Sequence, residues 1–443
     1  MDSIDRQALA ELVLGFSKAD ETEVSVYFED NRLTRFTRNA IHQNIATQDV
    51  VVRIRAIVGG ATGVIDTNDL RESSLKGAME RAVEIARLAP ADPDFPGLVQ
   101  ASSTAAPPDA FDEDTANASA EQRAKIAADV FATAEKHDFW AAGYVTTSHS
   151  GVSILNSRGT HASFDGTNAG MNVKQVGPDS TGFAEKHSTS VAALDGNAVG
   201  TVAAEKALHS RHPKAVEPGS WTVILEPPAF GELLSYLIHH FSAETYDEGS
   251  SFLSGGLDKK YVGESVTLSD DYAHPLAPGM PFDYEGQPTQ RLTLLDRGVA
   301  KHLVTDIYWA KKLKLANTGH GLPAPNSWGP QARHVVVASG SKSREQLIAE
   351  TERGLLISRF WYIRPVDDRL TIMTGMTRDG TFLIENGEVV SGVRNMRFNE
   401  SILTALSQAD FSSDQSRTSG YSYSTVAPTV RLAAFQFSSL TNF

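Results

Sequence analysis

The sequence predicts an α+β protein, with an N-terminal mixed-sheet domain that carries helices and a C-terminal domain dominated by antiparallel β-sheet. Two patterns lead to this prediction. Apolar residues recur at helical spacing in several segments, and alternating β-branched segments bounded by turn residues fill much of the rest. The chain has 443 residues, of which 41% are hydrophobic, so it is long enough for two or three domains.

Helices in the first half are expected where apolar residues return every three or four positions. The predicted ranges are 3–18, 74–89, 120–137 and 199–210. Strands are expected where β-branched residues alternate with polar ones. Their predicted ranges are 23–29, 33–39, 50–58, 139–148, 152–156 and 163–177. We expect Asp30-Asn31 to be the turn of a first hairpin and Gly59-Gly60 to be a second turn.

Two segments break the pattern. Residues 90–119 are rich in Pro, Ala, Ser and Asp, with few side chains that can pack, and predict a long surface connection. Residues 212–220, HPKAVEPGS, separate an Ala-rich helix from a strand. We therefore place the domain boundary there, with an N-terminal domain at 1–215 and a C-terminal domain at 216–443.

The second half is expected to consist mainly of short strands. Their predicted ranges are 221–226, 265–268, 291–296, 300–303, 335–338, 355–363, 370–373, 381–385 and 389–393. A short helix is expected at 306–312 and a Gly/Pro-rich loop at 315–331. Ser343 and Gln346 form a capping box for a helix through Arg353, which Gly354 is placed to end. Asn386-Gly387 is a strong hairpin signal.

A strongly amphipathic helix is expected after Pro227 and Pro228, since proline is tolerated in a first helical turn. Its apolar stripe consists of Phe230, Leu233, Leu234, Leu237, Ile238 and Phe241. His239 and His240 come at its end, followed by Glu244 and a loop rich in Gly and Ser.

This stretch resembles the TldD/PmbA proteins, also called TldD/TldE. In the TldD branch the helix carries HExxxH, whose two His bind zinc, and a Cys near the C-terminus is the third ligand. Counting back from the tail at 251–255 puts Leu234 at the first His, Ser235 at the Glu and His239 at the second His. The chain has no Cys. By motif it therefore resembles the PmbA/TldE branch, which lacks the zinc site, and the TGHG and IENGEVV segments extend the resemblance.

Two groups of residues are candidates for binding. His240 and Glu244 are four apart and could chelate a metal weakly, but we favour an i,i+4 pair at a helix end. His320 lies between two Gly in a loop, where a side chain can approach a ligand closely. The tentative substrate-binding residues are His239, His240, Glu244, Gly319, His320 and Gly321. No catalytic residue and no metal ligand is assigned in this chain.

Four arginines on or beside strands could instead pair with the carboxylates of a peptide, or form surface charges and salt bridges of the fold. They are Arg53, Arg55, Arg333 and Arg364.

Composition excludes several classes of partner and chemistry. The net charge is −14, and an acidic chain binds nucleic acid poorly because that binding neutralises phosphates. Without Cys there are no disulfides, thiolate ligands or thiol nucleophiles. No apolar run approaches the length of a membrane span, and no signal peptide is read. We expect a soluble cytoplasmic protein with neither nucleic-acid nor membrane partners.

The resemblance implies a non-catalytic TldE/PmbA-like subunit of a TldD/TldE-type zinc metalloprotease that degrades or processes unfolded peptides. The zinc is then expected in a TldD-like partner, in a heterodimer, and no cofactor is expected in this chain. Two alternatives stay open. One is a self-contained peptidase with a rearranged metal site at His239, His240 and Glu244. The other is a homodimeric protein that binds peptides without cutting them.

Overall fold

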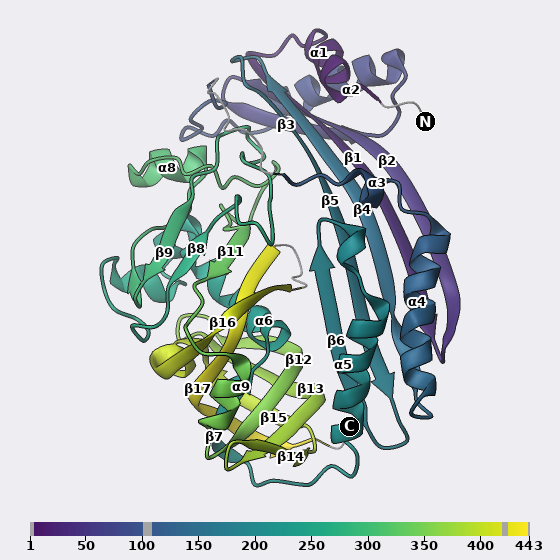
Figure 1. The fold of residues 1–443 in the computed structure, drawn as a ribbon. Helices are drawn as coiled ribbons and strands as arrows, with labels where there is room; N and C mark the ends of the chain where they lie inside the picture. The colour runs from purple at the N-terminus through teal and green to yellow at the C-terminus, as the bar shows by residue number, and fades with distance from the viewer. Residues whose placement is uncertain (1–3, 101–108, 419–423, 442–443) are drawn as a thin grey trace.

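The computed structural model describes residues 4–100, 109–418 and 424–441, and it confirms the α+β class. Two sheets organise the chain (Figure 1). The N-terminal sheet contains β1 to β6, and the C-terminal sheet contains β7 to β17. Helices pack on each of them.

The N-terminal sheet has the order β3-β2-β1-β4-β5-β6, and all its pairings are antiparallel. Its strands are β1 (Glu21–Thr37), β2 (Ala40–Val58), β3 (Ala61–Thr67), β4 (Trp140–Asn156), β5 (His161–Val176) and β6 (Thr181–Ser188). Several of these strands are much longer than predicted. The two strands predicted at 23–29 and 33–39 form one continuous strand, β1, and those predicted at 139–148 and 152–156 form another, β4.

The predicted turn at Asp30-Asn31 is therefore wrong. Both residues lie inside β1 and pair with β2, and the hairpin turns at Arg38-Asn39, where both φ angles are positive. The carboxylate of Asp30 is satisfied within the strand, since Arg32, two residues on and on the same face, donates two hydrogen bonds to it. Residues whose types are typical of a turn can thus lie inside a strand when a neighbouring side chain pairs with them. The Gly59-Gly60 turn is confirmed, with positive φ at both residues.

Four longer helices bury their apolar sides against the N-terminal sheet. They are α1 (Arg6–Leu14), α2 (Glu72–Leu88), α4 (Ala120–Glu135) and α5 (Gly196–His209). The helices α1 and α2 pack at one end of the long strands, whereas α4 and α5 lie along the rest of them (Figure 1).

The expected surface connection at 90–119 is partly packed. Leu98 and Val99 are buried, and the side-chain amide of Asn156 donates to the carbonyl oxygen of Val99. The connection also holds a short helix, α3 (Glu113–Ala116), which Asp112 caps. Residues 101–108 lie outside the described residues.

The C-terminal sheet has eleven strands, and antiparallel pairings dominate it. Its strands are β7 (Gly219–Leu225), β8 (Leu268–Asp270), β9 (Leu292–Asp296), β10 (Val299–Ala300), β11 (His334–Val337), β12 (Arg353–Asp367), β13 (Ile372–Glu385), β14 (Glu388–Gly392), β15 (Met396–Ser401), β16 (Ala409–Thr418) and β17 (Ser424–Leu440). Strand β7 pairs with both β12 and β17, so β7, β12, β13, β15 and β17 form a closed ring.

The amphipathic helix predicted after residue 227 is α6 (Pro227–Leu237), continued as the 3₁₀ helix η2 (Ile238–Phe241). All six residues of its predicted apolar stripe are buried in the core that the strand ring encloses. The remaining helices are α7 (Ala243–Asp247), α8 (Ile307–Leu313), α9 (Arg344–Ala349) and α10 (Ile402–Ala405).

The capping box at Ser343 is confirmed, but the helix that it starts is shorter than predicted and ends at Ala349. Gly354 does not end it. This glycine lies in β12, where a Cβ atom would come 2.8 Å from the carbonyl oxygen of Thr222 in β7. Close packing of two strands therefore explains the glycine. The predicted hairpin at Asn386-Gly387 is confirmed, with positive φ at both residues.

Two buried carboxylates join the two sheets. Asp379 of β13 forms ion pairs with Lys174 of β5 (2.8 Å) and Arg359 of β12 (3.3 Å). Glu226, just before α6, pairs with Lys206 of α5 (2.6 Å) and with Arg344 of α9 (2.9 Å). Each acid thus binds one lysine from the N-terminal half and one arginine from the C-terminal half.

Asp379→Asn should lower the free energy of unfolding by about 3 kcal/mol, because it leaves two cations without their buried partner. Asparagine tolerates the positive φ of 52° at this position, so backbone strain should add little. The measurement is urea unfolding of wild type and variant.

Asp66→Asn is the matched control, since it removes a surface ion pair with Arg53 in which the Asp66 side chain is 45% exposed. Its cost should stay under about 1 kcal/mol. Equal costs for the two variants would contradict the role given to Asp379.

Candidate functional site

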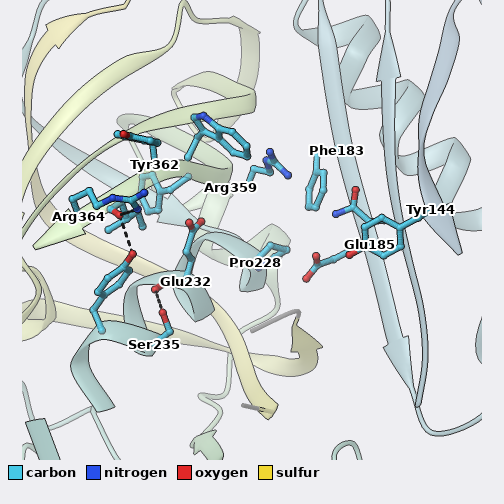
Figure 2. A pocket seen from close by; sticks show the side chains of 14 residues that line it. Tyr144, Phe183, Glu185, Pro228, Glu232, Ser235, Arg359, Tyr362 and Arg364 are labelled. Atoms are coloured by element: carbon cyan, nitrogen blue, oxygen red, sulfur yellow. Dashed lines mark hydrogen bonds between the residues drawn. The ribbon is translucent and has the colours of Figure 1, made fainter. Parts of the chain in front are cut away.

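A pocket of 330 Å³ lies between the two sheets, in the size range of ligand-binding pockets. We call it the inter-sheet pocket. Helix α6, strand β12 and strands β4 to β6 supply its walls (Figure 2). Its lining residues are Tyr144, Asn172, Phe183, Glu185, Pro228, Glu232, Ser235, Tyr236 and residues 359–364.

Helix α6 presents its polar face to this pocket, because its apolar stripe is committed to the core on the other side. Glu232 and Tyr236 are four residues apart and so lie on one face, a turn from each other. The hydroxyl of Ser235 donates to the carbonyl oxygen of Glu232 (2.7 Å) and is thus engaged by the helix itself.

Strand β12 lies against α6 and lines the same side of the pocket through an irregular segment, opposite the N-terminal sheet (Figure 2). Its pairing register with β13 shifts between Trp361 and Arg364, and Tyr362 has a positive φ of 58°. Such bulges re-aim side chains. Phe360 and Ile363 are buried in the core, whereas Trp361, Tyr362 and Arg364 are exposed.

Charged groups of both signs face the pocket. Arg359 is paired with Asp379, and its guanidinium lies over the rings of Phe183 (4.6 Å) and Trp361 (5.3 Å). Figure 2 shows Glu232 and Glu185 on opposite sides of the space between α6 and the N-terminal sheet. Burial raises the pKa of Glu232 to about 7, against the attraction of Arg359, and the negative charge of Glu185 adds to the rise. Glu232 can therefore exchange a proton near neutral pH.

The positions that align with HExxxH do not fit a zinc ion. Leu234 is buried in the core, the hydroxyl of Ser235 is bonded to the helix backbone, and His239 lies beyond the end of α6. The sequence offers no Cys as a third ligand. In the ranges that the structure describes, no three His, Cys, Asp or Glu side chains are grouped so that they could hold a metal ion.

The predicted pair between His240 and Glu244 is not formed among the described residues, because the α-helical spacing is lost. Helix α6 ends at Leu237, a 3₁₀ turn follows, and α7 begins only at Ala243. His240 is buried against Phe252, and burial lowers its pKa to about 4, helped by the nearby His239. Its imidazole is thus neutral at physiological pH.

Gly319-His320-Gly321 lies in the predicted loop, but His320 is fully buried rather than exposed. One ring nitrogen bonds to the hydroxyl of Thr318 (2.9 Å), and the other lies 3.5 Å from a carboxylate oxygen of Asp270. The backbone N–H of Gly321 donates to Asp283. These contacts give His320 a structural position in the fold.

Gln331 links the two predicted groups of residues. Its backbone N–H donates to the carbonyl oxygen of His320, and its side chain bonds to the Nδ1 atom of His239. None of the six tentative substrate-binding residues lines the inter-sheet pocket. Their role in substrate binding stays a prediction.

Arg364, one of the four arginines that the sequence suggested could pair with a carboxylate, lines the pocket. Glu232, Tyr236 and the wall from the N-terminal sheet were not predicted from the sequence. The i,i+4 spacing of Glu232 and Tyr236 opposite the apolar stripe was a usable signal. The contribution of Tyr144 and Glu185 carries no local signal, because it arises from the packing of distant strands.

In the described parts of the chain, no helix has the length and apolar character needed to cross a membrane.

Comparisons with known proteins find one family repeatedly. The family model described as PmbA/TldA metallopeptidase C-terminal domain matches residues 218–439, and the model of domain 1 of the same family matches residues 20–86. The chain is 24% identical to the Metalloprotease PmbA of Escherichia coli O157:H7 over 403 residues, which are 85% of this chain and 84% of that protein. It is also 24% identical to the Metalloprotease PmbA homolog of Haemophilus influenzae, over 77% of this chain and 76% of that one.

Among solved structures, TldE from Thermococcus kodakarensis superposes with a TM-score of 0.90 at 24% identity, over 98% of this chain and 99% of that chain. This likeness shows that the two proteins share a fold.

Glu232→Gln should change how stability depends on pH. The pKa of Glu232 is raised in the folded protein above its ordinary value of 4.5 to about 7, so the folded state binds the proton more tightly. The stabilisation that comes from this tighter proton binding is fully present below pH 4.5 and is lost as the pH rises through about 7. The variant should lack this loss, which amounts to at most about 3 kcal/mol. Urea unfolding between pH 4.5 and 8 measures it.

Glu264→Gln is the control, because Glu264 is exposed and its pKa is lowered by Lys260, so it does not titrate in this range. Its pH curve should follow the wild type. If the Glu232→Gln curve also runs parallel to the wild type, the assigned titration of Glu232 is wrong.

Proposed function

We propose a function from the premise that this chain belongs to the PmbA/TldD metallopeptidase family. In this proposal it is a TldE/PmbA-like subunit that binds unfolded peptides and does not cut them by itself. A TldD-like subunit carries the zinc and cuts the peptides, in a heterodimer located in the cytoplasm. Residues 1–215 and 216–443 act as its two domains, each built on one sheet.

The observation that carries the proposal is the position of Leu234 in the core. A zinc hydrolase needs three protein ligands and an open position for water. Leucine at the first ligand position packs into the apolar core behind α6, and Ser235 replaces the Glu that would act as general base. Of the three ligand positions only His239 keeps a metal-binding side chain, and the general base is absent.

Peptide binding is supported by the inter-sheet pocket and by its neighbour β6. This strand lies at the edge of the N-terminal sheet and, among the described strands, pairs only with β5. Extended peptides bind to such edges through their backbones, which suits substrates of varied sequence. Phe183 and Glu185 of β6 also line the pocket, so a peptide on this edge would reach the pocket directly.

The self-contained peptidase is disfavoured by the positions of its proposed ligands. His240 is buried against Phe252 and does not pair with Glu244 in the described chain. The peptide-binding homodimer has the same pocket available, and the experiment below separates it from the subunit role.

We predict that this chain alone does not cleave an unfolded peptide and that a mixture with an HExxxH-bearing paralogue does. The measurement incubates the peptide with this chain, with the partner and with both, each with and without a chelator. Cleavage that needs the mixture and is blocked by chelation is the expected result.

Chelator-sensitive cleavage by this chain alone would overturn the proposal in favour of the self-contained peptidase. If neither the chain nor the mixture cleaves but the chain binds peptide, the homodimeric binding protein becomes the better reading.

A further inference from the structure

Arg364 is a charged group of the inter-sheet pocket for which the described part of the chain supplies no ion-pair partner. Arg359 pairs with Asp379, and Glu185 lies 3.7 Å from His187. In the described residues Arg364 joins no ion pair. Its Nη1 atom donates to the neighbouring carbonyl oxygen of Ile363 (2.7 Å), and its guanidinium lies over the ring of Tyr362 (4.4 Å). A guanidinium carries five N–H donors, so most of them remain for a ligand.

The same carbonyl oxygen also connects Arg364 to α6. The hydroxyl of Tyr236 also donates to the oxygen of Ile363 (2.9 Å), so Arg364 and Tyr236 meet at one acceptor. Glu232 lies one helical turn before Tyr236 on the same face. The guanidinium of Arg364 and the carboxyl group of Glu232 are thus held on one side of the pocket (Figure 2).

We propose that this pocket recognises a carboxylate of the bound peptide, with Arg364 as a bidentate donor and the side chain of Glu232 as a second donor. This inference rests on the proposed function, because it names the chemical class of peptide that the subunit binds. A planar guanidinium matches a carboxylate in geometry and is the side chain best suited to it.

The protonation of Glu232 makes the recognition depend on pH. Two charged groups act on the pKa of Glu232, Arg359 from β12 and Glu185 from β6. The other titratable or polar groups that line the pocket with it are Arg364 from β12, Tyr144 from β4, and Ser235 and Tyr236 from its own helix. Because burial raises the pKa of Glu232 to about 7, its carboxyl group is protonated below that pH and can donate a hydrogen bond to a ligand carboxylate. Above it, two carboxylates would repel each other, so affinity should fall as pH rises through 7.

Aromatic rings surround these polar groups. Tyr144, Phe183, Trp361 and Tyr362 line the pocket, which suits a carboxylate carried next to an apolar or aromatic side chain. Either a C-terminal carboxylate or an Asp or Glu side chain would provide the same chemistry, and the two sources need separate probes.

The experiment titrates the full-length chain with three N-acetylated hexapeptides by isothermal titration calorimetry. One ends in phenylalanine with a free carboxylate, the second is its C-terminal amide, and the third is the amide with one internal Glu. At pH 6 we expect a carboxylate-bearing peptide to bind at least about tenfold more tightly than the neutral amide, as for one charge-assisted hydrogen bond. Whichever carboxylate peptide shows this gain identifies the source.

Variants test which residues produce the preference for a carboxylate-bearing peptide. Arg364→Gln should abolish it, whereas Arg397→Gln, which changes an exposed arginine of β15 outside the pocket, should keep it. Glu232→Gln should keep the preference and remove its fall between pH 6 and 8, because an amide donates at both values. Circular dichroism checks that each variant is folded.

Equal binding of all three peptides by the wild type would overturn the inference while leaving the peptide-binding function standing. The inference also fails if Arg364→Gln retains the preference. If no peptide binds to the wild type at all, both the inference and the proposed function fall. The comparison among peptides needs no variant, so the test does not depend on the folding of one.

Discussion

The arrangement of the two sheets depends on the buried carboxylate of Asp379. It takes Lys174 from the N-terminal sheet and Arg359 from the C-terminal sheet, and its side chain is only 3% exposed. A buried acid is stable as an ion only when it is paired, and here the pairing requires both sheets. Arg359 also lines the inter-sheet pocket, so the same ion-paired group contributes to the contact between the sheets and to a pocket wall.

The apolar patterns of the sequence were sufficient to predict helices and strands whose apolar side chains pack into a single core. The stripe of α6 was predicted residue by residue, because every member contacts the same apolar interior. The Asn386-Gly387 hairpin was also predicted correctly, because both turn residues have positive φ angles, which favour Asn and Gly. The sequence pattern gave a wrong prediction where a polar side chain finds its hydrogen-bond partner inside a strand. Asp30 has the composition of a turn residue, but Arg32 donates a hydrogen bond to its carboxylate within β1.

The site was harder to predict than the fold because its residues come from segments far apart in sequence. His240 and His320 attracted attention as polar residues in a suggestive context, yet both are buried and held by structural contacts. Glu232 is an ordinary acid in the sequence, and its pKa is raised to about 7 first by burial and then by the charge of Glu185 from β6. Both causes arise from the packing of distant segments, so no single segment of the sequence contains them.

The two faces of α6 make separate contacts, one with the apolar core and the other with the inter-sheet pocket. A histidine at the position of Leu234 would bring polar nitrogens into the apolar core unless a metal or hydrogen bond satisfied them, at a cost of about 1–3 kcal/mol. Leucine removes that cost and adds apolar burial, so the core face gains stability without the metal. The opposite face, with Glu232 and Tyr236, makes its contacts with β12 and does not use the ligand positions. Leucine at position 234 therefore places no physical demand on the opposite face, and the pocket does not depend on a metal ligand at that position.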